Sequence, residues 1–517
     1  MNLTVGVTEW RPQWQLILGQ IGAPVAVVGG EREVTLDQYG VIIVTARSTR
    51  QDKDMLLRYL ARGGGILVEA HVAEWLLGTG SVPAYVKYVD PEGDPLFHGI
   101  LPGFIHASLL LPTGAENLES DSGKKLTRVM RHGEGFVLIL PGTFSECVLD
   151  TKVMRRNFPT PGPLLPSERV ARRSKQTVRA IIERSLEYLY FERKLPFVSL
   201  WPFPEGHPTI FGFRVDTDFA SEEHSDKLYN LCHDHKIPGS WFVETASPGD
   251  GIRRYAKMEN QEIGLHCFRH RVFSSFIRNE LDVKKGLRIL AREQIRPLGY
   301  AAPFGLWNVS LAKAVEHHGF TYSSEFTLHY DDLPFYPHLG DRFSRVLQVP
   351  VHPITTGHLR NAHHSPGDME LYFTDLVQDH MEHRLPILVY DHPSNAHLQV
   401  LNWLVNAVRE RGIPTVPLID YAQWWKRRNA LNWTARFDGD SLMIDGMQPE
   451  SSVWISVRKS VTEWTVEAMK EVMDLQALKW RKNEPEVNVR TSMSRRSLLN
   501  RKMIMNDILH YYWRFKL

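Results

Sequence analysis

Few cysteines, no long apolar run and almost no net charge mark this sequence, and each absence excludes a class of protein. The 517 residues include three cysteines, Cys147, Cys232 and Cys267. So sparse and odd a set cannot build a disulfide framework or a cysteine-rich zinc site, so we expect a reducing, cytoplasmic environment. The sequence contains no uncharged apolar stretch of roughly 18 residues that would span a bilayer. Its first residues also lack the basic start and apolar run of a standard secretory signal.

The charge balance argues against a dedicated nucleic-acid binder. The chain has 61 Lys and Arg against 59 Asp and Glu, a formal net charge of +2. Phosphate recognition needs concentrated positive charge, so we expect no nucleic-acid partner. With 43% hydrophobic and 23% charged residues, the composition is that of an ordinary globular protein. The length predicts about three folded units.

Positive charge is concentrated in residues 479–517, which carry ten Lys or Arg and three Asp or Glu. Apolar residues spaced three to five apart, among them Leu498, Met503 and Ile508, allow one apolar stripe on a helix. Such a tail can contact an anionic membrane surface peripherally, at the inner membrane face, or dock against the chain's own domains. The pattern favours docking and leaves the membrane alternative open.

Residues 1–195 show the pattern of a parallel α/β domain. Short apolar runs such as Val41–Val44 and 66–68 alternate with helix-like stretches such as 53–62. Gly63-Gly64-Gly65 is expected to end a helix and lead into a strand.

Two segments of this half, 59–69 and 133–141, resemble the flavodoxin-like scaffold of the class I glutamine amidotransferase superfamily. Enzymes of that superfamily place a cysteine nucleophile on the turn after the strand that here ends at Glu69. The turn here reads Ala70-His71-Val72. The resemblance therefore implies a doubly wound α/β domain that lacks amidotransferase chemistry.

Two proline-rich passages divide the chain. Residues 158–166 predict a loop, after which Ser167 is expected to cap a helix that runs to about Tyr190. Residues 195–208 predict the linker to a second domain.

Residues 209–428 are expected to form a (β/α) barrel, distorted or incomplete, because strand-like runs recur there with helices between them. Residues 429–517 change to short alternating runs separated by Asp-Gly turns, which predict a small β-rich unit followed by the helical basic tail. The eight runs of the barrel are 210–215, 240–243, 262–266, 297–301, 320–323, 346–349, 386–390 and 415–418.

Two carboxylates, Asp216 and Asp218, end the first of these runs. Alternate side chains on a strand point the same way, so both can face one site. Catalytic groups collect at the carboxyl ends of barrel strands. Taken alone, so short a pattern favours a solvated turn over a site.

Two histidines, His266 and His270, follow the third run. Two imidazoles at this spacing, with a carboxylate from elsewhere, form a facial metal-binding set that leaves positions open for water and substrate. The chain has 23 histidines, so a chance pair is common. The pair gains weight from its position at the end of a strand soon after Asp216 and Asp218.

These motifs, with the later ones, resemble the polysaccharide deacetylases of carbohydrate esterase family 4 over most of residues 209–395. The Asp-Asp motif corresponds to Asp216-Thr217-Asp218, with one residue inserted, and the His-x-x-x-His motif to His266 and His270. The third motif, Arg-x-Pro-Tyr/Phe-Gly, corresponds to residues 301–305, where Ala301 takes the place of the arginine that orients the base. The other matching segments are 239–243, loosely 319–326, and 387–393.

The resemblance implies a role for each matching residue. Asp216 is the general base, and a divalent metal, with zinc as first choice, is held by Asp218, His266 and His270. The backbone N–H of Phe304 helps to hold the oxyanion, and His392 protonates the departing amine. Arg214 is a candidate substitute for the missing arginine, and Asp391 or Glu325 is a candidate to orient His392.

We therefore expect a metal-dependent hydrolase that removes an N-acetyl group from an amino sugar of a glycan or glycan precursor. A cytoplasmic location favours a precursor. The alternatives are hydrolysis of another C–N amide bond, and an inactive carbohydrate-binding or scaffold protein. The histidines at His352 and in residues 358–364 also allow a second metal, but a solvated or substrate-facing loop is favoured because no carboxylate shares their spacing.

Overall fold

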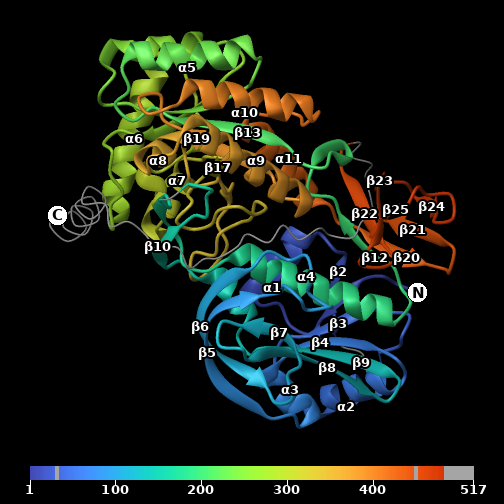
Figure 1. Cartoon of the computed structure of the whole chain (residues 1–517). Coiled ribbons are helices and arrows are strands. Elements are labelled where there is room, and N and C mark those ends of the chain that lie inside the picture. Colours follow the sequence, from blue (N-terminus) through green and yellow to red (C-terminus); the bar gives the residue numbers. More distant parts are fainter. Residues whose placement is uncertain (30–33, 163, 447–451, 483–517) are drawn as a thin grey trace. The chain divides into compact units, whose positions relative to one another are not determined.

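The structure is a computed structural model that describes residues 1–29, 34–162, 164–446 and 452–482 (Figure 1). These residues form two compact units, each made of segments that are distant in sequence. The predicted basic helix lies outside the described residues, so its membrane contact stays a prediction. The first unit comprises Met1–Asp150, Arg173–Gly206 and residues 427–482, and the second comprises Thr151–Arg172 and His207–Lys426.

A nine-stranded sheet forms the centre of the first unit, in the order β2-β1-β3-β4-β9-β8-β7-β5-β6. The first five strands in this order, β2, β1, β3, β4 and β9, run parallel to one another. Each later strand pairs antiparallel with its neighbour. The strands are β1 (Val5–Val7), β2 (Val25–Val27), β3 (Val41–Val44), β4 (Gly65–Glu69), β5 (Ser81–Asp90), β6 (Gly103–Pro112), β7 (Asn117–Ser120), β8 (Lys125–His132) and β9 (Gly135–Leu140).

Helices cover both faces of the parallel part of this sheet. Ile66 of β4 packs with side chains of α2 (Arg50–Ala61) and α3 (Ala70–Leu77) in one buried hydrophobic cluster. Neighbouring residues of a strand face opposite sides. The adjacent Gly65 faces Leu189 of α4 (Lys175–Glu192). The predicted doubly wound α/β arrangement is confirmed.

The β-rich segment after residue 429 belongs to the first unit because β22 pairs antiparallel with β12. A buried ion pair, with Arg458 Nη1 2.7 Å from Glu187 Oε1, also joins β22 to α4. The sequence pattern predicts a separate domain for this segment. Its elements form a sheet β12-β22-β23-β25 and a sheet β20-β21-β24, from β12 (Phe197–Leu200), β20 (Thr434–Phe437), β21 (Ser441–Asp445), β22 (Trp454–Arg458), β23 (Glu463–Ala468), β24 (Val472–Asp474) and β25 (Arg481–Lys482); α1 (Pro12–Ile21) is the first helix of the unit.

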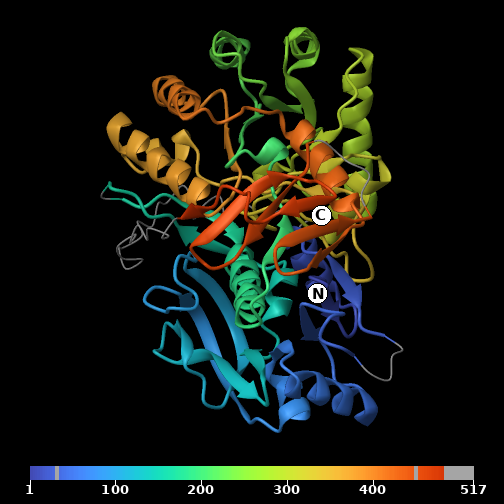
Figure 2. The same ribbon diagram turned by 90° about the vertical axis from the view of Figure 1, so that its right-hand side faces the viewer.

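A seven-stranded parallel sheet forms the second unit, in the order β18-β17-β16-β15-β14-β13-β19. Helices α5, α6, α9 and α10 lie outside its curve (Figure 2). The strands are β13 (Phe211–Asp216), β14 (Ser240–Glu244), β15 (Glu262–Cys267), β16 (Gly299–Tyr300), β17 (Tyr322–Ser323), β18 (Leu347–Gln348) and β19 (Ile387–Asp391). The helices are α5 (Glu222–Asp234), α6 (Phe276–Arg292), α7 (Val309–His317), α8 (Thr356–Asn361), α9 (Pro366–Glu382), α10 (Leu398–Glu410) and α11 (Leu418–Ala430).

The two edges of this curled sheet meet. The backbone N–H of His352, just after β18, donates to the carbonyl of Leu388 in β19 over 2.8 Å. The eighth expected run makes only an isolated bridge, between Thr415 and Phe211, because α11 begins at Leu418. The expected distorted barrel is confirmed as a curled sheet of seven strands with this seam.

The prediction that a helix begins just after Ser167 is wrong. Residues Ser167–Ala171 form strand β11, which pairs antiparallel with β10 (Val153–Asn157), and α4 begins only at Lys175. The partner strand lies before the proline-rich loop, so the pairing depends on a contact that local helix signals do not reveal.

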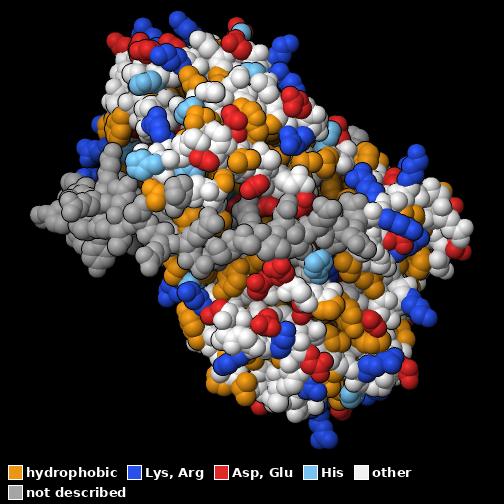
Figure 3. Space-filling view, viewed as in Figure 1, with side chains coloured by type: hydrophobic (Ala, Val, Ile, Leu, Met, Phe, Trp, Pro, Cys, Tyr) orange, Lys and Arg blue, Asp and Glu red, His pale blue; other side chains and the backbone are white. Residues whose placement is uncertain are grey.

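Two surface features bear on partners. On the face seen in Figure 3, basic and acidic side chains are interspersed. Among the described residues, no helix is both long enough and apolar enough to cross a membrane.

Candidate metal centre

Three strands of one part of the curled sheet, β15, β13 and β19, bring the predicted site residues together. Asp216 is the last residue of β13, and Asp218 follows it. His266 lies near the end of β15, and His392 follows β19. Because parallel strands end at the same edge of a sheet, these side chains converge at the carboxyl end of the barrel.

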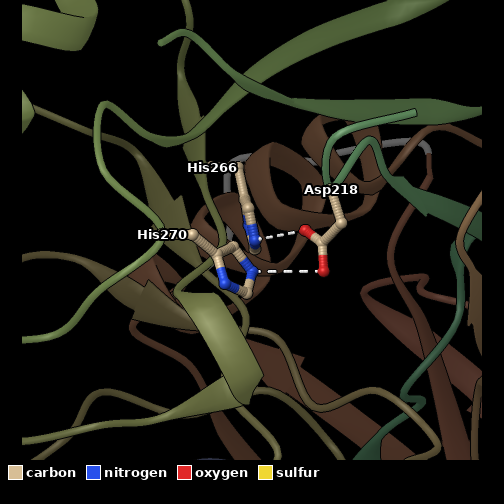
Figure 4. Close-up of side chains that lie close together, drawn as sticks. All are labelled: Asp218, His266 and His270. Atoms are coloured by element: carbon tan, nitrogen blue, oxygen red, sulfur yellow. Dashed lines mark ion pairs between the residues drawn. The ribbon is translucent and has the colours of Figure 1, made fainter. Parts of the chain in front are cut away.

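Three side chains share one centre (Figure 4). Asp218 Oδ1 lies 2.9 Å from His266 Nε2, and Asp218 Oδ2 lies 3.1 Å from His270 Nε2. Despite these short distances, Asp218 Oδ1 and both Nε2 atoms are buried without hydrogen-bond geometry to any described residue. Zinc–ligand bonds of 2.0–2.2 Å at tetrahedral angles place neighbouring donor atoms about 3.3 Å apart. The three donors therefore fit a divalent metal.

His392 is the fourth member of this group. Its Nε2 lies 3.3 Å from Asp218 Oδ2. Burial disfavours the imidazolium, but the Asp218 and Asp216 carboxylates outweigh it and raise the pKa of His392 to about 9. Burial also opposes ionisation of Asp218, yet the charges of His266 and His392 hold its pKa well below its ordinary value.

Asp216 is held by Arg214 rather than placed among the ligands. Arg214 Nε and Nη2 donate to the two carboxylate oxygens of Asp216 over 2.7 and 2.6 Å. Arg214 Nη1 donates to the carbonyl of Ser324 over 2.5 Å, and the rings of Phe242 and Tyr390 lie 5.4 and 5.2 Å from its guanidinium carbon. Arg214 thus contacts the carboxylate of Asp216, the residue that it was a candidate to orient.

The two carboxylates that were candidates to orient His392 both accept hydrogen bonds from backbone N–H groups. Asp391 accepts hydrogen bonds from the backbone N–H of His392 and of Thr356, over 2.9 and 3.1 Å. Glu325 accepts from the backbone N–H of Ala302 over 3.2 Å, and burial raises its pKa to about 7. Asp391 therefore fixes the backbone of His392, and Glu325 supports the third-motif segment.

Phe304 borders the centre. Its ring packs edge-on against that of His270, with ring centroids 4.4 Å apart. Its backbone has a φ of 58°, in the left-handed region that non-glycine residues seldom adopt. This strained turn, Pro303–Gly305, brings the segment predicted to hold the oxyanion next to a predicted ligand.

One positioning residue, Asp282 of α6, has no signal in the sequence motifs. Its carboxylate accepts hydrogen bonds from the backbone N–H groups of Phe268 and Arg269, each over 3.0 Å. These two residues lie in the loop between His266 and His270, so Asp282 holds that loop. Burial raises the pKa of Asp282 to about 6. No motif near Asp282 in the sequence identifies it, because the residues that it binds, Phe268 and Arg269, come 14 and 13 residues earlier in the chain.

The first unit carries no thiol at the position of the amidotransferase nucleophile. Glu69 ends β4 there, and its carboxylate accepts a hydrogen bond from the backbone N–H of Ser145 over 2.7 Å. Cys147 lies nearby in a short buried helix, and burial raises the pKa of its thiol to about 12.

No known protein family and no curated protein matches the sequence. Among solved structures, a polysaccharide deacetylase from Mycobacterium smegmatis is 18% identical, over 44% of this chain and 93% of that chain, with a TM-score of 0.37. A family 4 carbohydrate esterase from Streptomyces lividans in complex with acetate is 11% identical, over 40% and 92%, with a TM-score of 0.29. A family 4 pseudoenzyme from Bacillus anthracis is 16% identical, over 43% and 68%, with a TM-score of 0.31. The amidotransferase resemblance of residues 1–195 stays a prediction.

Proposed function

We propose that this chain is a metal-dependent hydrolase that removes an N-acetyl group from an amino sugar of a glycan or glycan precursor. The proposal rests on one observation: a group of possible metal ligands and a carboxylate paired with an arginine lie together at the carboxyl end of the barrel. Asp218, His266 and His270 offer three unsatisfied donors to one centre. Asp216 is held beside them by its contact with Arg214, whose Nη2 lies 2.6 Å from Asp216 Oδ2.

A divalent metal held by Asp218, His266 and His270, with zinc as first choice, would supply Lewis acidity that polarises an amide carbonyl and makes water nucleophilic. Two of these donors are imidazole nitrogens and one is a carboxylate oxygen, a set that suits zinc. They converge at the carboxyl end of the strands, the end at which barrel enzymes carry their active sites.

Asp216 would accept the proton of the attacking water. Its two hydrogen bonds from Arg214 fix the orientation of the carboxylate. The rings of Phe242 and Tyr390 lie near the guanidinium and help to position the arginine. Arg214 would thereby serve as the positioning residue that Ala301 cannot be.

His392 would donate a proton to the nitrogen of the departing amino sugar. Its Nε2 lies 3.3 Å from Asp218 Oδ2, which places the imidazole beside the proposed metal centre. The backbone N–H of Phe304 would donate to the oxygen that gains negative charge during attack. Atoms balance: water adds to the acetyl carbon, acetate leaves, and the amine keeps the proton from His392.

The deciding experiment is acetate release by the purified full chain from a panel of N-acetylated amino sugars and glycans, with and without a chelator. We expect release that the chelator abolishes and added zinc restores. The exposed Asp226, replaced by Asn, is the matched control for Asp216→Asn. Stoichiometric metal without acetate from any substrate would contradict the N-acetyl assignment, and absence of both metal and hydrolysis would favour a scaffold.

A further inference from the structure

A second set of metal-binding side chains lies in the barrel unit, on elements that contribute nothing to the first centre. Asp331 lies in the loop between β17 and β18, His352 follows β18, and His380 lies in the last turn of α9. Donor atoms of all three lie within 4.8 Å of one another. The side chains of His352 and His380 are 3% and 4% exposed, and that of Asp331 is 21% exposed.

The distances in this Asp331–His352–His380 cluster match those of a metal site. Asp331 Oδ1 lies 2.9 Å from His352 Nδ1 and 3.6 Å from His380 Nε2. Donors bound to one zinc ion at 2.0–2.2 Å and tetrahedral angles lie about 3.3 Å apart, a value between these two. A slight opening of the Asp331–His352 pair and a slight closure of the Asp331–His380 pair would therefore place the three donors around one ion.

The outer hydrogen bonds prepare both imidazoles as ligands. His380 Nδ1 lies 2.8 Å from the carbonyl of Pro386, which can only accept, so Nδ1 carries the proton and neutral His380 presents the lone pair of Nε2 to Asp331. His352 Nε2 lies 2.7 Å from the hydroxyl of Tyr372, which leaves Nδ1 for the side of Asp331. A metal-bound histidine typically gives its other ring N–H to such a partner.

The backbone supports the position of the carboxylate. Asp331 has a φ of 48°, in the left-handed region that Asp and Asn tolerate better than most residues. The neighbouring Tyr330 hydroxyl accepts a hydrogen bond from Arg156 over 3.1 Å. A second bond lies within the loop itself, where His329 Nε2 is 2.7 Å from Asp332 Oδ2 and so bridges across Asp331. The first contact ties the loop to a distant segment, and the second fixes the turn that carries Asp331.

We propose that Asp331, His352 and His380 bind a second divalent transition metal, with zinc as first choice, that clamps the barrel at its seam. His352 is the residue whose backbone N–H joins the two sheet edges, and His380 bonds the residue that precedes β19. An ion held by these three side chains would cross-link the long loop, the seam and α9. The deep burial of both imidazoles suits a structural role.

The test counts zinc ions in the full chain after chelator treatment, zinc reloading and dialysis, using elemental analysis and calorimetric titration. We expect two equivalents in the parent, one in Asp331→Asn, one in Asp218→Asn and none in the double variant. Asparagine keeps the shape of the side chain and tolerates the left-handed backbone, so Asp331→Asn is expected to fold. His380→Gln is the second single variant and should also lose one equivalent.

The matched control is His358→Gln. His358 Nε2 lies 2.9 Å from Glu168 Oε2, so it is a half-buried histidine–carboxylate pair, but it belongs to neither three-donor group found among the described residues. This variant should keep two equivalents. A parent with one equivalent that Asp218→Asn removes entirely, or unchanged zinc in both Asp331→Asn and His380→Gln, would overturn the proposal.

Thermal melting tests the clamp itself. Zinc added to stripped Asp218→Asn protein should raise its Tm by roughly 5 °C, because a ligand bound only by the folded state stabilises it. The same addition should leave the Tm of the Asp218→Asn/Asp331→Asn double variant unchanged. An equal rise in both would show that the cluster does not hold the ion. Neither readout depends on acetate release, so failure of this proposal and failure of the proposed function remain distinguishable.

Discussion

Arg214 and Asp216 lie two residues apart on β13 and form a doubly hydrogen-bonded ion pair inside the barrel. The side chains are 0% and 4% exposed. Since alternate residues of a strand share a face, β13 supplies both the proposed base and the cation that holds it. In the proposed mechanism, Arg214 would take the part of the arginine for which Ala301 stands in the third motif.

Removing this arginine should destabilise the barrel unit strongly. Arg214→Met leaves the Asp216 carboxylate buried and unpaired, which costs about 3–5 kcal/mol of the free energy of unfolding. Denaturant unfolding of the second unit, followed by tryptophan fluorescence, measures the loss. Asp216→Asn added to Arg214→Met should recover part of it, because the uncompensated charge is gone.

Arg254→Met is the control for this prediction. Arg254 pairs with Glu222 and Asp226, whose side chains are 73% and 56% exposed, so its loss should cost about 1 kcal/mol or less. If Arg214→Met and Arg254→Met lowered the free energy of unfolding equally, the buried pair would contribute no more to stability than the exposed one.

Asp216→Asn should separate chemistry from metal binding. Asparagine fills the same space but cannot accept a proton, so we expect kcat to fall about 10²- to 10⁴-fold while bound metal is unchanged. Metal content and acetate release, measured on one preparation, check both parts. Hydrolysis at the parental rate would assign the base to another group.

His266→Ala and His270→Ala should each remove metal from the first centre. Changes outside the ligand set already cost 10- to 100-fold in metal affinity, so loss of a direct ligand should cost about 100-fold or more. Zinc analysis after dialysis should show one equivalent fewer than in the parent. His224→Ala, on the surface of α5, should keep the parental content, and full occupancy in both ligand variants would contradict the assignment.

The parts of the fold that local pattern determines could be predicted. The predicted helix ends at Ala61, just before the glycine triplet, and the predicted strand begins at Gly65, the last glycine of the triplet. The strands β13, β14 and β15 also lie close to the apolar runs that predict them. Ser167–Ala171 was misassigned because its strand partner lies beyond a proline-rich loop. The attachment of β22 to β12 was missed for the same reason: the two strands are more than 250 residues apart.

The site shows the same division. Asp216, Asp218, His266 and His270 stand in short motifs at strand ends, where a spacing rule applies. Asp282 and Asp331 do not, because each acts on groups that only the folded chain brings near it. For His352, no carboxylate stands nearby in the sequence at a spacing that predicts a metal site. The carboxylate that faces it, Asp331, comes from a loop 21 residues earlier.

The first unit should release no ammonia from glutamine. Burial raises the pKa of the Cys147 thiol to about 12, so the nucleophilic thiolate is essentially absent at neutral pH. The parent and Cys147→Ser should both give the background rate in an ammonia assay. Release by the parent that Cys147→Ser abolishes would restore the amidotransferase reading.

Glu69 should make the first unit lose stability as the pH rises. Burial raises the pKa of this carboxyl from its ordinary value of 4.5 to about 7, although the backbone N–H of Ser145 donates to it. Between these two pH values the unfolded chain releases the proton and the folded chain keeps it. The free energy of unfolding therefore falls as the pH rises through this window, by about 3 kcal/mol in total, and falls no further above about pH 7.

Glu69→Gln removes this titration while its side-chain carbonyl can still accept the hydrogen bond from Ser145. The variant should match the parent below pH 4.5 and exceed it increasingly up to pH 7, a difference measured by thermal or denaturant unfolding across that range. Glu74→Gln, one turn into α3 with a side chain 55% exposed, is the control and should follow the parent at every pH. Because every other titrating group is shared, the difference between the Glu69→Gln and parental curves isolates Glu69. Parallel curves would mean that this carboxyl is already ionised in the folded protein.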